Sequence, residues 1–181
     1  SVWIARRNIP TMRSASPGRI ADPDACVETV LTRVGRRLVV GLPAGIGKPN
    51  LLANAFVRRA ASDPSIRLTI VTALSLEKPV GKSELERHFL APLVERVFED
   101  YPDLLYVKDL RAGTLPPNVE VCEFFMKTGD YLGNEAAQQH YISANYTFVA
   151  RDMAVQGMNV IAQAVAAREG AGGLRLSLSS N

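Results

Sequence analysis

Apolar runs and helical stripes alternate along the chain. Residues 37–42 and 68–74 are almost continuously apolar and rich in β-branched residues, which is typical of strands covered on both faces of a parallel sheet. Between them, the apolar stripe of residues 51–57 lies opposite Arg58 and Arg59, which predicts a helix to about residue 61. We expect residues 68–74 to be a central parallel strand.

A second helix is predicted from Ser83 onward. Ser83 and Glu86 have the spacing of a capping box, in which each side chain bonds the backbone of the other. Apolar residues then recur every four positions, at Leu85, Phe89, Leu93 and Val97. Pro92 lacks the amide hydrogen that would bond to His88, so this helix should kink or restart there.

The remaining elements complete an α/β pattern. Strands are expected at 119–126 and 158–165, and helices at 134–141 and 147–156. Leucines alternate with polar residues in 174–178, so a fifth strand is expected to have begun when the chain stops, as if it were a truncated fragment. Strands joined by helices imply right-handed crossovers and a mostly parallel sheet.

The amino-terminal region divides into an arm and a first helix. Residues 1–24 hold four arginines among serines, prolines and glycine without a sustained period, which predicts an extended arm. A short helix is expected over 26–34, with Asp22 or Asp24 as its N-cap and Gly35 after its end. The expected domain is therefore 25–181.

The junction between the first strand and the next helix, residues 41–50, is the strongest candidate for a binding site. Gly45 and Gly47 permit a tight turn that aims backbone N–H groups at an anionic ligand, with Lys48 and Asn50 beside it. The phosphate-binding P-loop does not fit, because Leu42 stands at its first glycine and a proline replaces its hydroxyl residue. The dinucleotide-binding pattern fails at its third glycine, where Asn50 stands. The alternative is a plain turn that only lets strand and helix pack closely, with a solvated Lys48.

Other polar residues offer weaker chemistry. The segment 75–82, beginning with Ser75, follows the second strand and lines the same crevice or is an ordinary connection. Glu120 and Glu123 lie on a predicted strand, where a nucleophile is conceivable but a sheet-edge glutamate is the simpler interpretation. The two histidines do not assemble into a catalytic triad. Asn145 is expected to cap the last helix.

Three separated blocks, residues 41–54, 68–79 and 145–152, resemble the amino-terminal domain of the acetyl-CoA hydrolase/transferase family, which is related to the family I CoA transferases. The similarity covers roughly residues 26–181. It implies a tandem α/β enzyme in which a glutamate attacks acyl-CoA through an acyl-glutamyl anhydride and a glutamyl-CoA thioester, with a carboxylate or water as second substrate. In that family the glutamate belongs to the carboxy-terminal domain, so no catalytic residue is expected in this chain.

Composition limits the other function classes. A length of 181 residues suits one α/β domain, and a formal charge of +3 with dispersed arginine pairs argues against nucleic-acid binding. Cys26 and Cys122 have no paired spacing and are expected to be buried thiols in a reducing compartment. His88 and His140 share no ligand spacing, so no metal site is expected. Without an apolar run of about 20 residues or a secretory signal, a cytoplasmic protein is expected.

The leading hypothesis is therefore one wall of an acyl-CoA site, with Gly45, Gly47, Lys48, Asn50 and Ser75 contacting substrate or CoA. Coenzyme A is then a substrate, and no permanently bound cofactor is expected. The expected partners are acyl-CoA, a small carboxylate or water, the carboxy-terminal domain and further copies of the chain, with no nucleic acid and no membrane. The alternative is a noncatalytic α/β module that binds a phosphorylated metabolite.

Overall fold

A computed structural model describes residues 18–178 and places a four-stranded parallel sheet at the centre of the protein. In spatial order the strands are β3 (Val119–Glu123), β2 (Arg67–Thr72), β1 (Arg37–Gly41) and β4 (Val160–Ile161). The α/β class, the parallel sheet and the internal position of β2 are thus confirmed. Every strand ends at the same edge, which is where ligands bind in open parallel sheets.

The strand register explains why these segments read as apolar runs. Leu38 of β1 pairs with Leu68 of β2, which pairs in turn with Val119 of β3, and all three side chains are buried. The central strands are therefore mostly buried, with Thr69 of β2 and Glu120 of β3 as a partly exposed polar pair.

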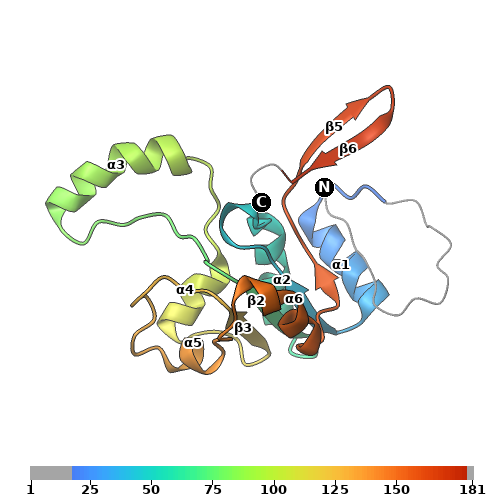
Figure 1. The fold of residues 1–181 in the computed structure, drawn as a ribbon, viewed down its shortest axis with the longest axis horizontal. Coiled ribbons are helices and arrows are strands. Elements are labelled where there is room, and N and C mark those ends of the chain that lie inside the picture. Colours follow the sequence, from blue (N-terminus) through green and yellow to red (C-terminus); the bar gives the residue numbers. More distant parts are fainter. Residues whose placement is uncertain (1–17, 179–181) are drawn as a thin grey trace.

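Each face of the sheet has its own helical layer. The larger core packs α1 (Pro23–Val34), α2 (Asn50–Ser62) and α4 (Leu105–Ala112) against one face. A smaller cluster on the other face holds side chains of α6 (Tyr146–Val155), including Val149 and Met153. Figure 1 shows α1 and α2 side by side next to the sheet.

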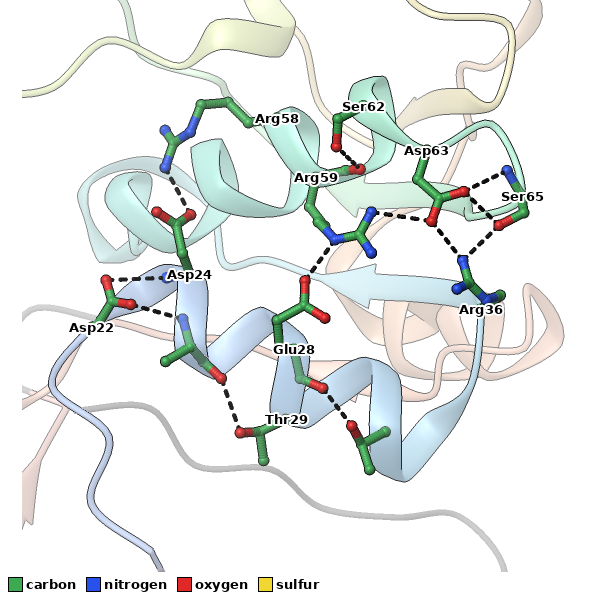
Figure 2. A network of polar contacts seen from close by, with 12 residues as sticks. Asp22, Asp24, Glu28, Thr29, Arg36, Arg58, Arg59, Ser62, Asp63 and Ser65 are labelled. Carbon is green, nitrogen blue, oxygen red and sulfur yellow. Dashed lines mark hydrogen bonds and ion pairs between the residues drawn. The ribbon is translucent and has the colours of Figure 1, made fainter.

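Ion pairs connect the exposed sides of α1 and α2. Arg58 bonds Asp24 at 3.0 Å, and Arg59 bonds both Glu28 at 2.5 Å and Asp63 at 3.1 Å (Figure 2). Exposed pairs of this kind add little stability. The buried apolar side chains that the two helices share in the larger core contribute more to their packing.

The helix α3 (Glu84–Phe98) stands apart from this core (Figure 1). Its predicted capping box is confirmed, because Ser83 and Glu86 bond each other's backbone. The helix does not restart at Pro92, which lies inside one continuous element. None of its residues is buried, and Phe89 is 78% exposed.

The carboxy-terminal strands differ most from the sequence prediction. Residues 174–178 do not extend the main sheet, because Gly173–Ser177 (β6) pairs antiparallel with Ala166–Gly170 (β5) in a separate hairpin. Gly173 turns the chain there with a φ of 90°, a left-handed conformation that favours glycine. The expected strand at 158–165 shrinks to the two residues of β4.

Helix boundaries shift more modestly. Helix α1 begins at Pro23, three residues earlier than expected, with Asp22 as the N-cap. Asn145 caps α6 as predicted, and α5 (Glu135–Gln139) lies within its predicted range. Helix α4 is an element that the sequence analysis missed. Of the expected arm, residues 1–17 lie outside the described residues.

Across residues 18–178, no helix is long and apolar enough to cross a membrane. Cys26 and Cys122 are free and buried, as expected.

Candidate functional site

The loops that follow the parallel strands form one continuous edge of the protein. The turn after β1 contains a short 3₁₀ helix, η1 (Gly45–Gly47), and leads directly into α2. Gly45 has a φ of 61°, so the turn requires glycine there. The buried Gly47 accepts a hydrogen bond from the amide of Ala164 at 2.9 Å, which ties this turn to the loop after β4.

Lys48 lies inside this edge rather than in solvent. It is 5% exposed, and its Nζ donates to the carbonyl oxygens of Ala73 and Leu74, the latter at 3.1 Å. Leu74 has a φ of 44°, an unusual conformation for a residue with a side chain, so the ammonium braces a strained turn after β2. Burial lowers the pKa of Lys48 to about 8, while attraction to Glu123 opposes that change.

Three further side chains join Lys48 in a buried polar cluster, defined here as Lys48, Ser75, Tyr106 and Glu123. Glu123 is 1% exposed and accepts a hydrogen bond from the Ser75 hydroxyl. That hydroxyl also lies 2.7 Å from the Tyr106 hydroxyl. Burial raises the pKa of Glu123, and the Ser75 hydrogen bond and Lys48 oppose the rise.

The two glutamates of β3 lie in different environments, because only Glu123 belongs to the buried polar cluster. Glu120 and Glu123 are three residues apart, so their side chains point to opposite faces of the strand. Glu120 is exposed, whereas Glu123 is enclosed by its partners. The Glu123 carboxylate is therefore buried against the loop after β2 and is not accessible for attack on a substrate.

A cavity of about 430 Å³ opens beside the cluster, at the start of α2. Two sequence-predicted site residues, Lys48 and Asn50, line it, whereas Gly45, Gly47 and Ser75 do not. Most of its lining is apolar, and the full set is Ile20, Ala21, Asp22, Pro23, Ile46, Lys48, Pro49, Asn50, Leu51, Leu52, Tyr101, Pro102, Gln163, Ala164 and Val165. The cavity can therefore enclose an apolar ligand with a few fixed polar contacts.

Polar groups at the start of α2 are not all satisfied. No side chain caps this helix, and the amides of Leu51 and Leu52 have no acceptor within residues 18–178. Asn50 is 6% exposed; its Nδ2 donates to the Pro102 carbonyl at 2.7 Å, but its buried Oδ1 has no partner among the described residues. Burial raises the pKa of Tyr101, and a hydrogen bond from Asn50 opposes that rise, so the Asn50 side chain ties the start of α2 to the segment before α4.

The charged lining residues are already engaged. Asp22 accepts hydrogen bonds from the backbone amides of Asp24 and Ala25, at 3.4 and 2.9 Å, as Figure 2 shows. Lys48 is held by the carbonyls described above. Within the described part of the chain, no group of three histidine, cysteine, aspartate or glutamate side chains is placed to hold a metal ion.

Sequence reasoning identified the edge but missed the roles of its buried groups. Tyr106 and Tyr101 come from a segment with no recognised pattern, and Glu123 was indistinguishable from a surface glutamate. Comparison with protein-family models, curated proteins and solved structures found no match for this chain.

Proposed function

We propose that this chain is the amino-terminal domain of an acetyl-CoA hydrolase or acyl-CoA:carboxylate CoA-transferase, and that the cavity beside α2 is one wall of its acyl-CoA site. The observation that carries the proposal is the cavity itself, at the carboxyl edge of a parallel sheet and next to the glycine turn. The resemblance of residues 41–54, 68–79 and 145–152 supplies the reaction class.

The buried polar cluster supports a wall rather than a catalytic centre. Glu123 accepts a hydrogen bond from Ser75 in the loop after β2, and the Lys48 ammonium from the turn after β1 attracts its charge. In this proposal the nucleophilic glutamate comes from the carboxy-terminal domain of the family. The chain on its own then binds acyl-CoA without turning it over.

Calorimetric titration with acetyl-CoA tests the binding step. Ile46 lines the cavity and is 66% exposed, so Ile46→Asp places a charge at the cavity without disturbing the core. Val80→Asp is the matched control, because Val80 is 81% exposed and does not line this cavity. We expect Ile46→Asp to weaken binding about tenfold or more and Val80→Asp to leave it unchanged, given that one hydrogen bond or buried methylene is worth about 1 kcal/mol.

Mass spectrometry after incubation with acetyl-CoA tests whether any glutamate of this chain acts as the nucleophile. We expect no covalent CoA or acetyl adduct on Glu120 or Glu123. An adduct on Glu123 would move the nucleophile into this chain. Failure of acetyl-CoA to bind at all, with binding of inorganic phosphate instead, would favour the noncatalytic module for phosphorylated metabolites.

A further inference from the structure

Two arginines at the amino edge of the sheet lie directly opposite each other in adjacent strands. Arg37 begins β1 and Arg67 begins β2, and the two are register partners in the parallel pairing of these strands. Their side chains therefore share one face of the sheet, and both residues are exposed. Like charges directly opposite each other destabilise a sheet. A bound anion would remove this repulsion.

Neither guanidinium has a carboxylate partner in the described part of the chain. The ion pairs of residues 18–178 engage other arginines and leave out Arg37 and Arg67. Arg36, the residue immediately before Arg37, is by contrast paired with Asp63 at 2.7 Å. The N–H groups of the two unpaired guanidiniums are therefore available to a ligand.

Both arginines line one cavity of about 220 Å³. This volume lies below the range of about 300–1,000 Å³ that is typical of drug-sized ligands, so the ligand must be small. The cavity lies at the opposite edge of the sheet from the cavity beside α2, since it is formed by the first residues of β1 and β2 and by the segment before β3. The other lining residues are Leu68, Thr69, Pro117, Asn118 and Glu120.

Glu120 limits the charge that the ligand can carry. It is the only carboxylate among the described residues that line this cavity, and it accepts a hydrogen bond from the Thr69 hydroxyl at 3.4 Å. Two arginines and one glutamate give the lining a net charge of +1. A monoanion neutralises this charge, whereas a dianion such as sulfate would exceed it and be repelled by Glu120.

We propose that Arg37 and Arg67 bind the carboxylate of a small monocarboxylic acid in this cavity. A guanidinium presents parallel N–H groups in a plane that matches the two oxygens of a carboxylate, and each carboxylate oxygen can accept more than one hydrogen bond. One carboxylate can therefore join both guanidiniums and replace their repulsion with attraction. The site shares no residue with the cavity beside α2 and is separate from the proposed acyl-CoA site.

Titration with propionate at constant ionic strength, followed through the side-chain Nε–H resonances of Arg37 and Arg67, tests the assignment. We expect saturable shifts of both resonances, and Arg37→Gln or Arg67→Gln should raise the dissociation constant about tenfold or more. Arg58→Gln is the matched control, because Arg58 is also exposed but does not line this cavity. It should leave the dissociation constant within twofold, and equal losses in all three variants would overturn the proposal.

The variant Glu120→Gln should change binding in the opposite direction. It raises the net charge of the lining from +1 to +2, so propionate should bind more tightly than in the wild type. Sulfate should bind this variant and leave the wild-type resonances unshifted. Weaker binding of propionate to Glu120→Gln would contradict the proposal.

A comparison of probes on the unmodified protein avoids any question of folding. Propionamide has nearly the same shape as propionate but no charge, so it should not shift the two arginine resonances. Equal binding of propionamide and propionate would overturn the role of the guanidiniums. Tighter binding of sulfate than of propionate would overturn the assignment of a monocarboxylate.

The stability of the protein gives a second readout. Because Arg37 and Arg67 repel each other, Arg67→Gln should raise the midpoint of urea unfolding slightly, and propionate should stabilise the wild type more than this variant. A lower midpoint for Arg67→Gln, with no effect of propionate on the wild type, would show that Arg67 has a structural role and would overturn the proposal.

Discussion

Two neighbouring parts of the carboxyl edge of the sheet, the buried polar cluster and the start of α2, differ in whether their polar side chains are paired. In the buried polar cluster, the Lys48 ammonium, the Ser75 hydroxyl and the Glu123 carboxylate are satisfied by one another or by backbone. Two residues after Lys48, Asn50 lines a cavity with an acceptor that no described group satisfies. The comparison indicates that the buried polar cluster holds the loops in place, whereas the start of α2 borders the cavity.

The largest expected effect on stability comes from substitutions in the buried polar cluster. Glu123→Ala removes the acceptor of the Ser75 hydroxyl and the nearby negative charge that attracts Lys48, and Lys48→Met leaves the carbonyls of Ala73 and Leu74 without their donor. Each change should lower the free energy of unfolding by about 3 kcal/mol, because it leaves buried polar partners of a charged group unsatisfied. Urea denaturation measures both.

A double-mutant cycle sharpens this result. Because the charges of Lys48 and Glu123 attract each other, the double variant Lys48→Met/Glu123→Ala should lose less than the sum of the single losses. Strictly additive losses would mean that the two side chains act independently, and the cluster would then not be one brace.

The protonation of Lys48 should make the stability of the buried polar cluster depend on pH. Burial lowers its pKa from 10.5 to about 8 in the folded protein, so between these values the unfolded chain binds a proton that the folded protein does not. The free energy of unfolding contributed by Lys48 therefore rises with pH across this window, by about 3 kcal/mol in full. The difference between wild type and Lys48→Met, measured from pH 7 to 11, isolates this contribution. A flat difference would place Lys48 in solvent.

Substitutions at the start of α2 should change the free energy of unfolding less than those in the buried polar cluster. Asn54→Ala removes a hydrogen bond and leaves the Leu105 amide unpaired, at an expected cost of about 2 kcal/mol. Asn50→Ala removes only one satisfied bond, together with an unsatisfied acceptor, so about 1 kcal/mol is expected. Thermal or urea unfolding of the two variants compares them directly. A larger loss from Asn50→Ala would show that its Oδ1 has a structural partner.

The sequence was a good guide to this edge because local patterns determine much of it. Continuous apolar runs identified the strands β1 and β2, and the glycine turn lies where the pattern placed it. The capping box at Ser83 and the N-cap at Asn145 are local signals, and both were confirmed.

Predictions failed where long-range contacts decide the structure. Nothing local distinguishes Glu123 from Glu120, because only packing encloses one and exposes the other. The alternating leucines of 174–178 correctly predict a strand, but the pairing partner depends on a turn that sends the chain back on itself. Lys48 was expected to reach a ligand or solvent, and the carbonyls that hold it come from the loop after β2.

The apolar stripe of α3 shows the same limit from the other side. Its four-residue spacing predicts the helix well, yet Leu85 and Phe89 are 79% and 78% exposed. Amphipathic spacing shows that one face of a helix is apolar, but it does not show which element of the protein covers that face.

The most direct test of the account is a residue-resolved titration of the chain with acetyl-CoA, observed through backbone amide resonances. The account predicts saturable shifts centred on Asn50, Leu51 and Leu52, with weaker changes in the buried polar cluster and none in the β5–β6 hairpin. Acetyl-CoA that leaves the start of α2 unchanged at saturating concentration, or that shifts only resonances remote from the cavity, would contradict it.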